Sequence, residues 1–467
     1  MSEIAKRNQM NVCVIGGAGY VGLVTGVGLA EIGHSVVNVD IDAERIALLA
    51  TGASPIYEEG MELVLRRNLD AGRIRFTTNL ADGIADSDVV FIAVGTPSRQ
   101  DGQTDLSHVI RVAEDLSHHL DSYKVIVVKS TVPVGAIPLV RSILSREKQE
   151  GKAFDIVSNP EFLREGKGMY DFFCPDRFVI GACSEKARKI MRRLYAPIIE
   201  RRALNLELSE PDRPATRNGR GEVPVVEVDL ASAQMIKYAS NAFLATRISF
   251  INEIAWLCEK VGADVKDVAR GMGYDGRIGH AYLEAGVGFG GPCLEKDLKT
   301  LISIGGTDSY GPRVLQAVLD RNNRQVEVVV NKLKGSIGDL LYQRTVAVFG
   351  LAFKAGTNDL RDSVSLKVID QLEKEGARVR AYDPLATAEA RRVRPDLQCC
   401  DDPQEAVSSA DALLILTEWP EFAKLDYGEL AAKMAMPRIV DARNLLDPET
   451  MRGYGFTYTG IGRGNLK

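Results

Sequence analysis

The chain has 467 residues, and at about 150 residues per domain this length predicts roughly three domains. Its 45% hydrophobic and 26% charged residues are typical of a globular protein and exclude a mainly disordered chain. The 58 Lys and Arg residues stand against 63 Asp and Glu residues, and a net charge of −5 argues against a protein built around nucleic-acid phosphates. No apolar run approaches the roughly 18 residues that a membrane-spanning helix needs, so we expect no membrane association.

The seven cysteines are scattered along the chain, and none forms a C-x-x-C pair with another. This spacing argues against a disulfide scaffold and against a structural zinc site, so we expect no metal. A reducing, cytoplasmic compartment is expected, in which a single thiol can stay reactive.

Residues 1–10 are polar and are expected to form a loose tail. From residue 11, short β-branched runs alternate with helical patterns. Near-continuous apolar runs of this kind are typical of parallel strands covered on both faces, and their alternation with helices predicts an open parallel sheet. The predicted strands are residues 11–16, 35–40, 88–94, 124–130 and 154–160.

Residues 209–224 are rich in Pro, Gly and charged residues and predict a surface loop or linker. Residues 229–262 contain neither Pro nor Gly until Gly262, and their apolar residues recur at helical spacing. They predict one long helix that ends at Gly262, either as the spine of an interdomain or dimer interface or as an ordinary buried helix.

A second alternating series follows the long helix. Its predicted strands are residues 345–353, 378–384, 411–419 and 438–446. The expected fold class is therefore α/β, with two Rossmann-like parallel-sheet domains joined by a long central helix. The expected divisions are a tail at 1–10, a dinucleotide-binding domain at 11–208, a linker at 209–224, a helical region at 225–335 and a second α/β domain at 336–467.

The first predicted strand leads into a glycine-rich motif. Gly17-Ala18-Gly19-Tyr20-Val21-Gly22 fits G-x-G-x-x-G, directly follows the strand and opens a helical pattern. Asp40 ends the next strand, where it would accept hydrogen bonds from ribose hydroxyls and so favours NAD. Arg45 lies nearby, so NADP stays open. The alternative is that the glycines serve only a tight turn.

Two later turns carry threonines at the ends of predicted strands. Thr96 lies in VGTP (94–97) and Thr131 in STVP (130–133). Open α/β sheets bind ligands at such strand ends, so both hydroxyls are candidates for cofactor or substrate contacts. Ordinary turns are the equally weighted alternative.

Cys293 is the candidate nucleophile. It lies in GVGFGGPCLEKDL (286–298), where four glycines precede it and Lys296 and Asp297 follow. A thiol in a glycine-rich turn near a cation is a candidate for a lowered pKa and for covalent catalysis. Most cysteines are inert and buried, and we assign that role to the other six.

Four further polar residues are candidates for the same site. Glu161 and Glu165 follow a strand in SNPEFLREG, and one helical turn there would place both carboxylates on one face. Lys237 and Asn241 are four residues apart on the long predicted helix and so share a face. A lysine buried on an apolar helix needs a partner or a task; surface placement of Lys237 is the alternative.

A nicotinamide cofactor beside a nucleophilic thiol suggests oxidation of an alcohol or aldehyde. The thiol can trap an aldehyde as a thiohemiacetal, a second hydride transfer then gives a thioester, and water releases an acid. A two-electron hydroxy-acid dehydrogenase, which would not need Cys293, and a non-catalytic dinucleotide-binding protein are the alternatives.

The chain resembles the UDP-glucose/GDP-mannose dehydrogenase family from about residue 11 to 460. The motifs that carry the resemblance are GAGYVG, VGTP, STVP, SNPEFLREG, the K-x-x-x-N of MIKYASNAF, RIG followed by GFGGPCLEKD, and FGLAFKAGTNDLRDS. The resemblance implies an N-terminal NAD-binding domain, a central helical dimerisation region and a C-terminal nucleotide-sugar-binding domain in a dimer or larger homo-oligomer. It also implies four-electron oxidation of the C6 alcohol of a nucleotide-hexose, with UDP-glucose as the expected substrate.

The resemblance also implies roles for individual residues. The implied catalytic residues are Cys293 as nucleophile, Lys237 and Asn241 as oxyanion donors, Asp297, Glu161 for proton handling and Thr131 beside an ordered water. The implied cofactor-binding residues are Gly17, Gly19, Tyr20, Val21, Gly22, Asp40, Arg45, Thr96, Thr131, Glu165, Lys296 and Arg361. The implied substrate-binding residues are Glu161, Phe162, Leu163, Lys237, Asn241, Tyr282, Gly290, Phe353, Lys354, Arg443 and, across a dimer interface, Arg277.

Two positions depart from the family pattern. Pro292 stands where many relatives carry Ser, and Glu284 stands where many carry Lys or Asn. Both lie in a segment associated with the nucleotide base, so dTDP-glucose stays an alternative to UDP-glucose. GDP-mannose and UDP-N-acetylhexosamines are weaker alternatives.

Overall fold

The computed structural model describes residues 9–97, 99, 104–202, 221–306 and 311–464. The chain divides into two compact units, residues 1–239 and 240–467. The division falls inside one long helix, α10 (Leu230–Val261), which confirms the helix predicted at 229–262. Gly262 follows this helix with φ +79°, the left-handed conformation in which glycine commonly ends a helix.

The first unit is built on an eight-stranded sheet in the order β3-β2-β1-β4-β5-β6-β7-β8. Val12 at the centre of the sheet lies opposite Val36 on one side and Val89 on the other. The strands are β1 (Asn11–Ile15), β2 (Ser35–Val39), β3 (Ile74–Thr77), β4 (Val89–Ile92), β5 (Lys124–Val128), β6 (Phe154–Ser158), β7 (Phe178–Ala182) and β8 (Val225–Val228).

The first six strands in this sheet are parallel, but β7 pairs antiparallel with β6 and β8 then pairs parallel with β7. The five strands predicted before residue 209 are confirmed as β1, β2, β4, β5 and β6. The sequence analysis did not predict β3, β7 or β8.

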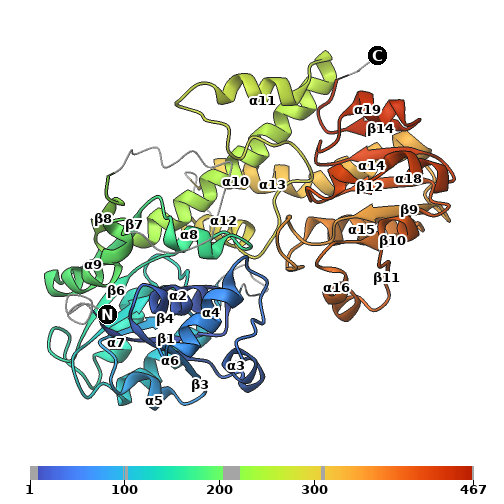
Figure 1. The fold of residues 1–467 in the computed structure, drawn as a ribbon. Helices are drawn as coiled ribbons and strands as arrows, with labels where there is room; N and C mark the ends of the chain where they lie inside the picture. The colour runs from blue at the N-terminus through green and yellow to red at the C-terminus, as the bar shows by residue number, and fades with distance from the viewer. Residues whose placement is uncertain (1–8, 98, 100–103, 203–220, 307–310, 465–467) are drawn as a thin grey trace. The chain divides into compact units, whose positions relative to one another are not determined.

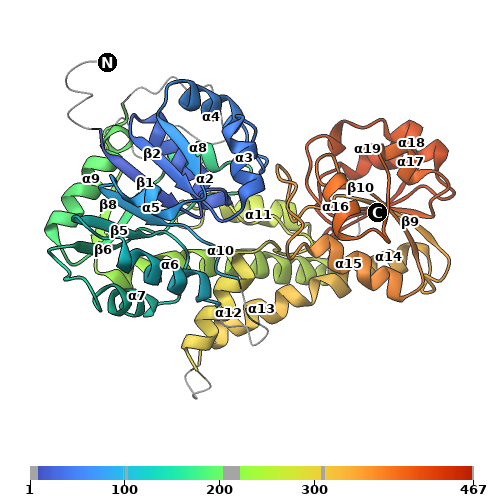
Figure 2. The ribbon, with the colours of Figure 1, turned by 90° about the horizontal axis from the view of Figure 1, so that it is seen from below.

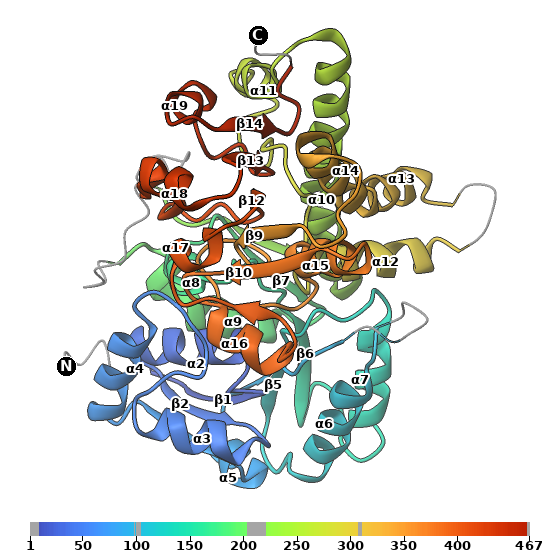
Figure 3. The same ribbon diagram turned by 90° about the vertical axis from the view of Figure 1, so that its right-hand side faces the viewer.

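Helices cover both faces of this sheet. On β1, Val12 and Val14 point into one core, and Cys13 and Ile15 point into the other. The first core is covered by α2 (Tyr20–Glu31), α3 (Ala43–Ala50), α4 (Met61–Asp70), α8 (Gly168–Phe173) and α9 (Glu185–Ile199). The second core is covered by α5 (Leu80–Ile84), α6 (Ser107–His118) and α7 (Ala136–Leu144), and Figure 3 shows α6 and α7 packed side by side.

The second unit contains a six-stranded sheet, parallel throughout, in the order β11-β10-β9-β12-β13-β14. Its strands are β9 (Thr345–Phe349), β10 (Arg378–Tyr382), β11 (Gln398–Cys399), β12 (Ala412–Ile415), β13 (Arg438–Asp441) and β14 (Thr457–Gly460). The four predicted strands are confirmed as β9, β10, β12 and β13. Together the two sheets confirm the predicted α/β class with two Rossmann-like domains (Figure 1).

Two cores again flank the central strand of this sheet. Val346 and Val348 of β9 point into one core, and Ala347 and Phe349 point into the other. The helices of the first side are α14 (Gln325–Ile337) and α15 (Val364–Lys374), joined by the C-terminal half of α10. The second side has α17 (Pro403–Val407), the 3-10 turn η1 (Phe422–Lys424), α18 (Tyr427–Lys433) and α19 (Pro448–Gly453).

The remaining helices of this unit are α11 (Val265–Gly273), α12 (Leu294–Ile304), α13 (Arg313–Asn323) and α16 (Thr387–Val393). Helices α12 and α13 pack against each other (Figure 2) around a small core that includes Phe289, Leu298 and Leu319.

Parts of two predicted segments lie outside the described residues: 1–8 of the tail and 209–220 of the linker. Residues 221–224 of that linker run directly into β8. Over the described ranges, no helix has the length and apolar character that crossing a membrane requires. In the same residues, no group of three or more His, Cys, Asp or Glu side chains is placed to hold a metal ion.

Candidate active site and cofactor turn

The glycine-rich turn after β1 is too tight for side chains. The N–H groups of Gly16 and Gly17 both donate to the carbonyl of Val39, each at 2.9 Å, which ties the turn to β2. A Cβ atom on Gly22 would lie 2.1 Å from the carbonyl oxygen of Gly16, and one on Gly17 would lie 2.6 Å from Cβ of Asn38. Glycine is therefore required at both positions by the protein itself.

The start of α2 fits the pyrophosphate of a dinucleotide. Among the described residues, no side chain caps this helix at Gly19, and its first turn holds no acidic residue. The first N–H groups of the helix are thus available to an anion, which the helix dipole also favours. Gly19 has room for a Cβ atom within the protein, its nearest neighbour being the Gly16 oxygen at 3.4 Å.

Asp40 follows β2 at the position that the motif predicts. Its carboxylate accepts hydrogen bonds from the N–H groups of Ala18 (2.9 Å) and Asp42 (3.2 Å). It is only partly buried, so its oxygens keep capacity for ribose hydroxyls. These residues fit NAD.

The other residues predicted at the cofactor have contacts within the first unit. Arg45 forms an ion pair with Asp42 at 3.3 Å, and the Thr96 hydroxyl donates to the carbonyl of Thr131 at 3.0 Å. Val21 packs against the core of this unit. Both side chains of the ion pair between Arg45 and Asp42 are exposed.

A buried ion pair joins Lys237 of α10 to Glu161. Their side chains meet at 2.9 Å, and the residues are only 5% and 8% exposed. The alternative that Lys237 lies on the surface is therefore wrong. Burial raises the pKa of the Glu161 carboxyl, but the charge and hydrogen bond of Lys237, the Leu163 N–H and the charge of Lys129 together hold it below its usual value.

Lys129 is a second buried lysine near this pair, and the sequence analysis missed it. Its Nζ donates to Oδ1 of Asn159 at 3.2 Å, and the same oxygen accepts from the Tyr195 hydroxyl at 2.8 Å. Burial lowers the pKa of Lys129 to about 8, partly offset by the charge of Glu161. The signal was a lysine at the end of an apolar strand run, comparable to the lysine on an apolar helix that drew attention to Lys237.

The loop after β6 carries the other predicted residues of this region. The Leu163 N–H donates to Glu161 at 2.5 Å, and the Phe162 ring lies 5.4 Å from the Lys237 ammonium. The guanidinium of Arg177 stacks 3.6 Å from the centre of the same ring. Glu165, four residues after Glu161, is partly buried.

In the second unit, Asn241 and Asp297 form a buried pair. The Asn241 amide donates to Asp297 at 2.6 Å, and the Lys296 ammonium contacts the other carboxylate oxygen, also at 2.6 Å. Asp297 is 1% exposed. A carboxylate this deeply buried is stable only when it is paired and hydrogen-bonded, and here it is both.

Cys293 is exposed and stands at the N-cap of α12. Its carbonyl accepts the first hydrogen bond of the helix from the Asp297 N–H at 3.0 Å, so thiol and carboxylate are one helical turn apart. A helix N-terminus favours a negatively charged thiolate. Burial raises the pKa of the Cys13 thiol to about 12 and that of the Cys400 thiol to about 11.

The backbone before Cys293 packs tightly against residues after β9. A Cβ atom on Gly290 would lie 2.7 Å from the Asp362 carbonyl oxygen, and one on Gly291 would lie 2.7 Å from the Phe353 ring. Gly291 also has φ +81°. The glycines thus serve protein packing here, in addition to any approach to a ligand.

The predicted substrate-side cations are placed differently from one another. Lys354 lies 5.6 Å from the centre of the Phe353 ring, and Arg443 donates to the Leu416 carbonyl at 2.8 Å. Arg277 and Arg361 are exposed, and each forms an ion pair with the aspartate two residues before it. Tyr282 is partly buried with φ +62°, a strained backbone conformation for tyrosine.

A dinucleotide turn in a doubly wound sheet, followed by a helical segment with a thiol at a helix start, is typical of the NAD-dependent dehydrogenase class. The comparison with family models specifies the family. The chain matches the NAD binding domain (residues 10–199), the central domain (231–324) and the UDP binding domain (347–448) of the UDP-glucose/GDP-mannose dehydrogenase family. The chain belongs to this family, which confirms the resemblance and the expected cofactor NAD.

Curated relatives cover nearly the whole chain. The UDP-glucose 6-dehydrogenase of Pseudomonas aeruginosa is 45% identical over 97% of this chain and 98% of its own. That of Rhizobium meliloti is 43% identical over 97% of this chain and its whole length. Among solved structures, a UDP-glucose dehydrogenase from Pyrobaculum islandicum is 35% identical with a TM-score of 0.85, covering 97% of this chain and 98% of its own.

Proposed function

We propose that this chain catalyses the NAD-dependent, four-electron oxidation of UDP-glucose to UDP-glucuronate. Curated relatives that are 43–45% identical over nearly their whole length are UDP-glucose 6-dehydrogenases. The observation that carries the proposal is that this chain keeps an exposed thiol at the start of α12 together with two buried carboxylates, each bonded to a donor on α10.

NAD supplies the hydride acceptor for each of two oxidations at C6. One primary alcohol, two NAD⁺ and one water give one carboxylate, two NADH and three protons. The protein must therefore hold an aldehyde between the two oxidations and must admit one water at the end.

We assign the covalent step to Cys293. Its thiolate adds to the C6 aldehyde, the C–S bond forms, and the carbonyl oxygen becomes the oxyanion of a thiohemiacetal. Loss of the second hydride leaves a thioester, and water then displaces the thiolate and releases the acid. The exposure of Cys293 and its place at a helix N-terminus support this assignment.

We assign oxyanion stabilisation to Lys237 and Asn241. The two residues are four positions apart on α10, a spacing that places side chains on the same helix face. Each is pre-oriented by a carboxylate, Lys237 by Glu161 and Asn241 by Asp297, so their donors need little reorganisation. Glu161, ionised in this pair, is the base for the water that hydrolyses the thioester, and Thr131 would support that water.

We assign nucleotide-sugar binding to the segment before Cys293 and to the second α/β domain. Arg443 and Lys354 supply the positive charge that a diphosphate needs, and Phe353, Tyr282 and Gly290 line the same segments. Residues 347–448 match the family's UDP binding domain, which supports a uridine nucleotide. The departures at Pro292 and Glu284 keep dTDP-glucose as the alternative base.

A second substrate class has its own support. A UDP-D-ManNAc dehydrogenase from Pyrococcus horikoshii has a TM-score of 0.83 and 26% identity with this chain, covering 98% of it and the whole of the solved chain. A UDP-N-acetylhexosamine is therefore the next candidate. The higher identity to UDP-glucose enzymes favours glucose.

The decisive experiment counts NADH formed per sugar consumed, with UDP-glucose, dTDP-glucose and UDP-N-acetylmannosamine measured in parallel. We expect two NADH per UDP-glucose, no aldehyde release and complete loss of turnover in Cys293→Ala. One NADH per sugar, or full turnover by Cys293→Ala, would contradict the thioester mechanism. A better rate with another sugar would overturn the substrate assignment while leaving the mechanism intact.

We further propose a homodimer formed along α10, in the cytoplasm. Phe243, Phe250 and Leu257 are exposed at seven-residue intervals on this helix, and Trp256 and Val261 are also exposed. An apolar stripe of this length is typical of a helix covered by another protein surface, here a second copy. A cytoplasmic location suits a reaction that consumes NAD and needs a reduced thiol.

A further inference from the structure

We propose that Glu58 is a positioning residue that holds the loop carrying Glu161 and Glu165 against the cofactor turn, the glycine-rich turn of residues 16–22 that leads from β1 into α2. The inference rests on the proposed function, because Glu161 and Glu165 receive their roles from it. The loop is the segment from Glu161 to Lys167, between β6 and α8, and Gly168 begins α8. Glu58 lies in the connection before α4, more than 100 residues earlier in the chain.

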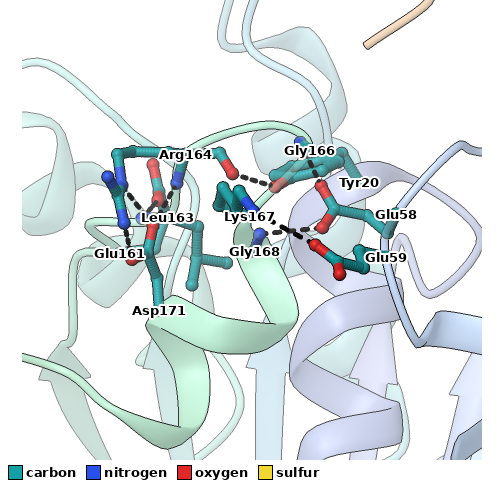
Figure 4. A network of polar contacts seen from close by, with 10 residues as sticks. All are labelled: Tyr20, Glu58, Glu59, Glu161, Leu163, Arg164, Gly166, Lys167, Gly168 and Asp171. Carbon is teal, nitrogen blue, oxygen red and sulfur yellow. Dashed lines mark hydrogen bonds and ion pairs between the residues drawn. The ribbon is translucent and has the colours of Figure 1, made fainter. Parts of the chain in front are cut away.

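The contacts of Glu58 are made by both of its carboxylate oxygens. Oε1 accepts the N–H of Gly166 at 2.5 Å, and Oε2 accepts the N–H of Gly168 at 2.8 Å. Glu58 is buried, and Figure 4 shows its side chain directed at the backbone of these two glycines. One side chain therefore fixes the C-terminal end of the loop through two charge-assisted hydrogen bonds.

Tyr20 links the same loop to the cofactor turn. Its hydroxyl donates to the Arg164 carbonyl at 2.8 Å, and a hydrogen bond also joins it to Glu58. A Cβ atom on Gly168 would lie 2.3 Å from this hydroxyl, so the phenol packs directly against the start of α8. Tyr20 is the first residue of α2, and it therefore ties the loop to the helix whose N-terminus receives the pyrophosphate.

The loop is held at three points along its length. Its start is fixed by the ion pair of Glu161 with Lys237, and its middle by Arg164, whose backbone N–H and guanidinium both donate to Asp171. Glu58 provides the third point. With both ends fixed, the Glu161 and Glu165 side chains gain a defined direction from a segment that has no regular secondary structure.

The burial of Glu58 argues that it serves this purpose. Burial raises the pKa of the Glu58 carboxyl above its usual value, and the hydrogen bonds from Tyr20 and from the backbone N–H groups of Gly166, Gly168 and Met169 offset only part of that rise. A buried carboxylate is costly, and a neutral residue of similar size would fill the space at lower cost. The two N–H groups are bonded to different oxygens of Glu58, and an amide would place an oxygen at one of these positions and an NH₂ donor at the other.

Glu58→Gln tests the inference, and Glu59→Gln is the matched control. The glutamine keeps the shape, but it can accept from only one N–H and turns its own NH₂ toward the other. Glu59 is the adjacent glutamate, exposed, and it pairs with Lys167 of the same loop at 3.1 Å (Figure 4). The control removes the same charge from the same segment without touching the loop backbone.

The first readout is hydrogen exchange of the peptide 162–170, which needs no sugar. We expect its amides to exchange about tenfold faster in Glu58→Gln, as for the loss of one buried charged hydrogen bond, and to stay within twofold of wild type in Glu59→Gln. Unchanged exchange in Glu58→Gln would overturn the inference even if UDP-glucose proved to be the wrong substrate.

The second readout separates positioning from stability. In Glu58→Gln we expect kcat to fall about tenfold and KM for NAD to rise, KM for UDP-glucose to stay within twofold, and the Cys293 thioester to accumulate by intact mass. A lowered melting temperature with unchanged kcat and KM would show a purely structural role and overturn the inference. If Glu58→Gln does not fold, Tyr20→Phe replaces it, with the same faster exchange at 162–170 expected and unchanged exchange contradicting the inference.

Discussion

Two lysines and one glutamate share the buried end of the first sheet. Lys237 contacts Glu161 directly, whereas Lys129 influences it by charge and is held by Asn159. If Lys237 is drawn toward an oxyanion during the reaction, Lys129 is the remaining cation that keeps Glu161 ionised. In the proposed mechanism, Lys237 then serves the substrate while Lys129 keeps the base Glu161 ionised.

Lys129→Met should change how stability depends on pH. The pKa of Lys129 falls from 10.5 to about 8 on folding, so between these values the unfolded chain binds the extra proton and wild-type stability rises with pH. We expect this rise, at most about 3 kcal/mol, to be missing in Lys129→Met. Chemical denaturation between pH 7 and 11 measures it, with the exposed Lys152→Met as control; parallel curves for Lys129→Met and wild type would refute it.

Asp297→Asn should weaken both the fold and the reaction. The carboxylate accepts from Asn241 and from Lys296, whereas an amide oxygen serves one donor and presents NH₂ to the other. We expect the free energy of unfolding to fall by about 1–3 kcal/mol and kcat to fall more than tenfold. Urea unfolding and steady-state kinetics measure the two effects, and the exposed Asp339→Asn should show neither. Wild-type kcat in Asp297→Asn would remove this residue from the mechanism.

Single residues could be predicted from the sequence only where they stand in a local pattern. Asp40 follows the glycine motif, Cys293 a glycine-rich segment and Lys237 an apolar helix. Glu58 has no such pattern, because its partners are the backbone N–H groups of Gly166 and Gly168, and nothing in a sequence marks a contact over that separation. Lys129 had a pattern that was not used.

At the scale of the element, glycine is needed in the turn from β1 into α2 for two different reasons. The protein's own packing requires Gly22, whereas we expect the bound cofactor to require Gly19. Gly22→Ala puts a Cβ atom 2.1 Å from the Gly16 oxygen, whereas Gly19→Ala meets only that oxygen at 3.4 Å. We expect Gly22→Ala to lower the melting temperature of the protein even without NAD. Gly19→Ala should keep that temperature but lose most of the increase that saturating NAD gives to wild type. If both variants had the same melting temperatures with and without NAD, the distances from a Cβ atom to the Gly16 oxygen would not explain the need for glycine in this turn.

Helix α10 provides a test of assembly. Phe243 on α10 and Leu63 on α4 are equally exposed, at 63% each. We expect Phe243→Ser combined with Phe250→Ser to convert a dimer into monomers in light scattering at micromolar concentration, because the substitutions remove apolar area from the proposed interface. Leu63→Ser should leave the mass unchanged. A wild-type chain that is monomeric would refute the proposed dimer.

Buried strands could be predicted from the sequence more readily than strands at the edges of the sheets. The predicted strands β1, β4, β5 and β6 lie inside the sheet and read as near-continuous apolar runs. The missed strands β3 and β11 are edge strands with exposed residues, and β8 is the opposite edge of the first sheet. For β7 the run FVIGA was apolar, but no local pattern marks the reversal by which it pairs antiparallel with β6.

At the scale of the whole molecule, the two sheets share one local arrangement, a glycine after the central strand and an aspartate after the neighbouring strand, but the two aspartates differ in burial. Gly16 and Gly350 both follow a central strand with positive φ, and both donate to the carbonyl that ends the neighbouring strand. An aspartate comes next in each case. Asp40 is partly exposed, but Asp383 is buried and accepts from four backbone N–H groups and the Trp419 indole. The carboxylate of Asp383 is therefore fully hydrogen-bonded by groups of its own domain.

We therefore expect one NAD per chain in calorimetric titration. Asp383→Asn should lower the free energy of unfolding by about 2 kcal/mol without changing NAD affinity, since its donors are all internal. Asp40→Asn should do the reverse and weaken NAD binding about tenfold. A second NAD per chain would show that the carboxyl end of the second sheet also takes a dinucleotide.

Because α10 is unbroken, the shared face of Lys237 and Asn241 depends on the number of residues between them more than on which residues these are. A helix advances about 100° per residue, so one inserted residue between them would rotate Asn241 away from the face of Lys237 by slightly more than a quarter of a turn. The backbone hydrogen bonds would carry that rotation through every following residue up to Val261. A substitution at the exposed Ala239 leaves the phase of the helix untouched. Lys237 and Asn241 are thus kept in register by the pitch of this helix.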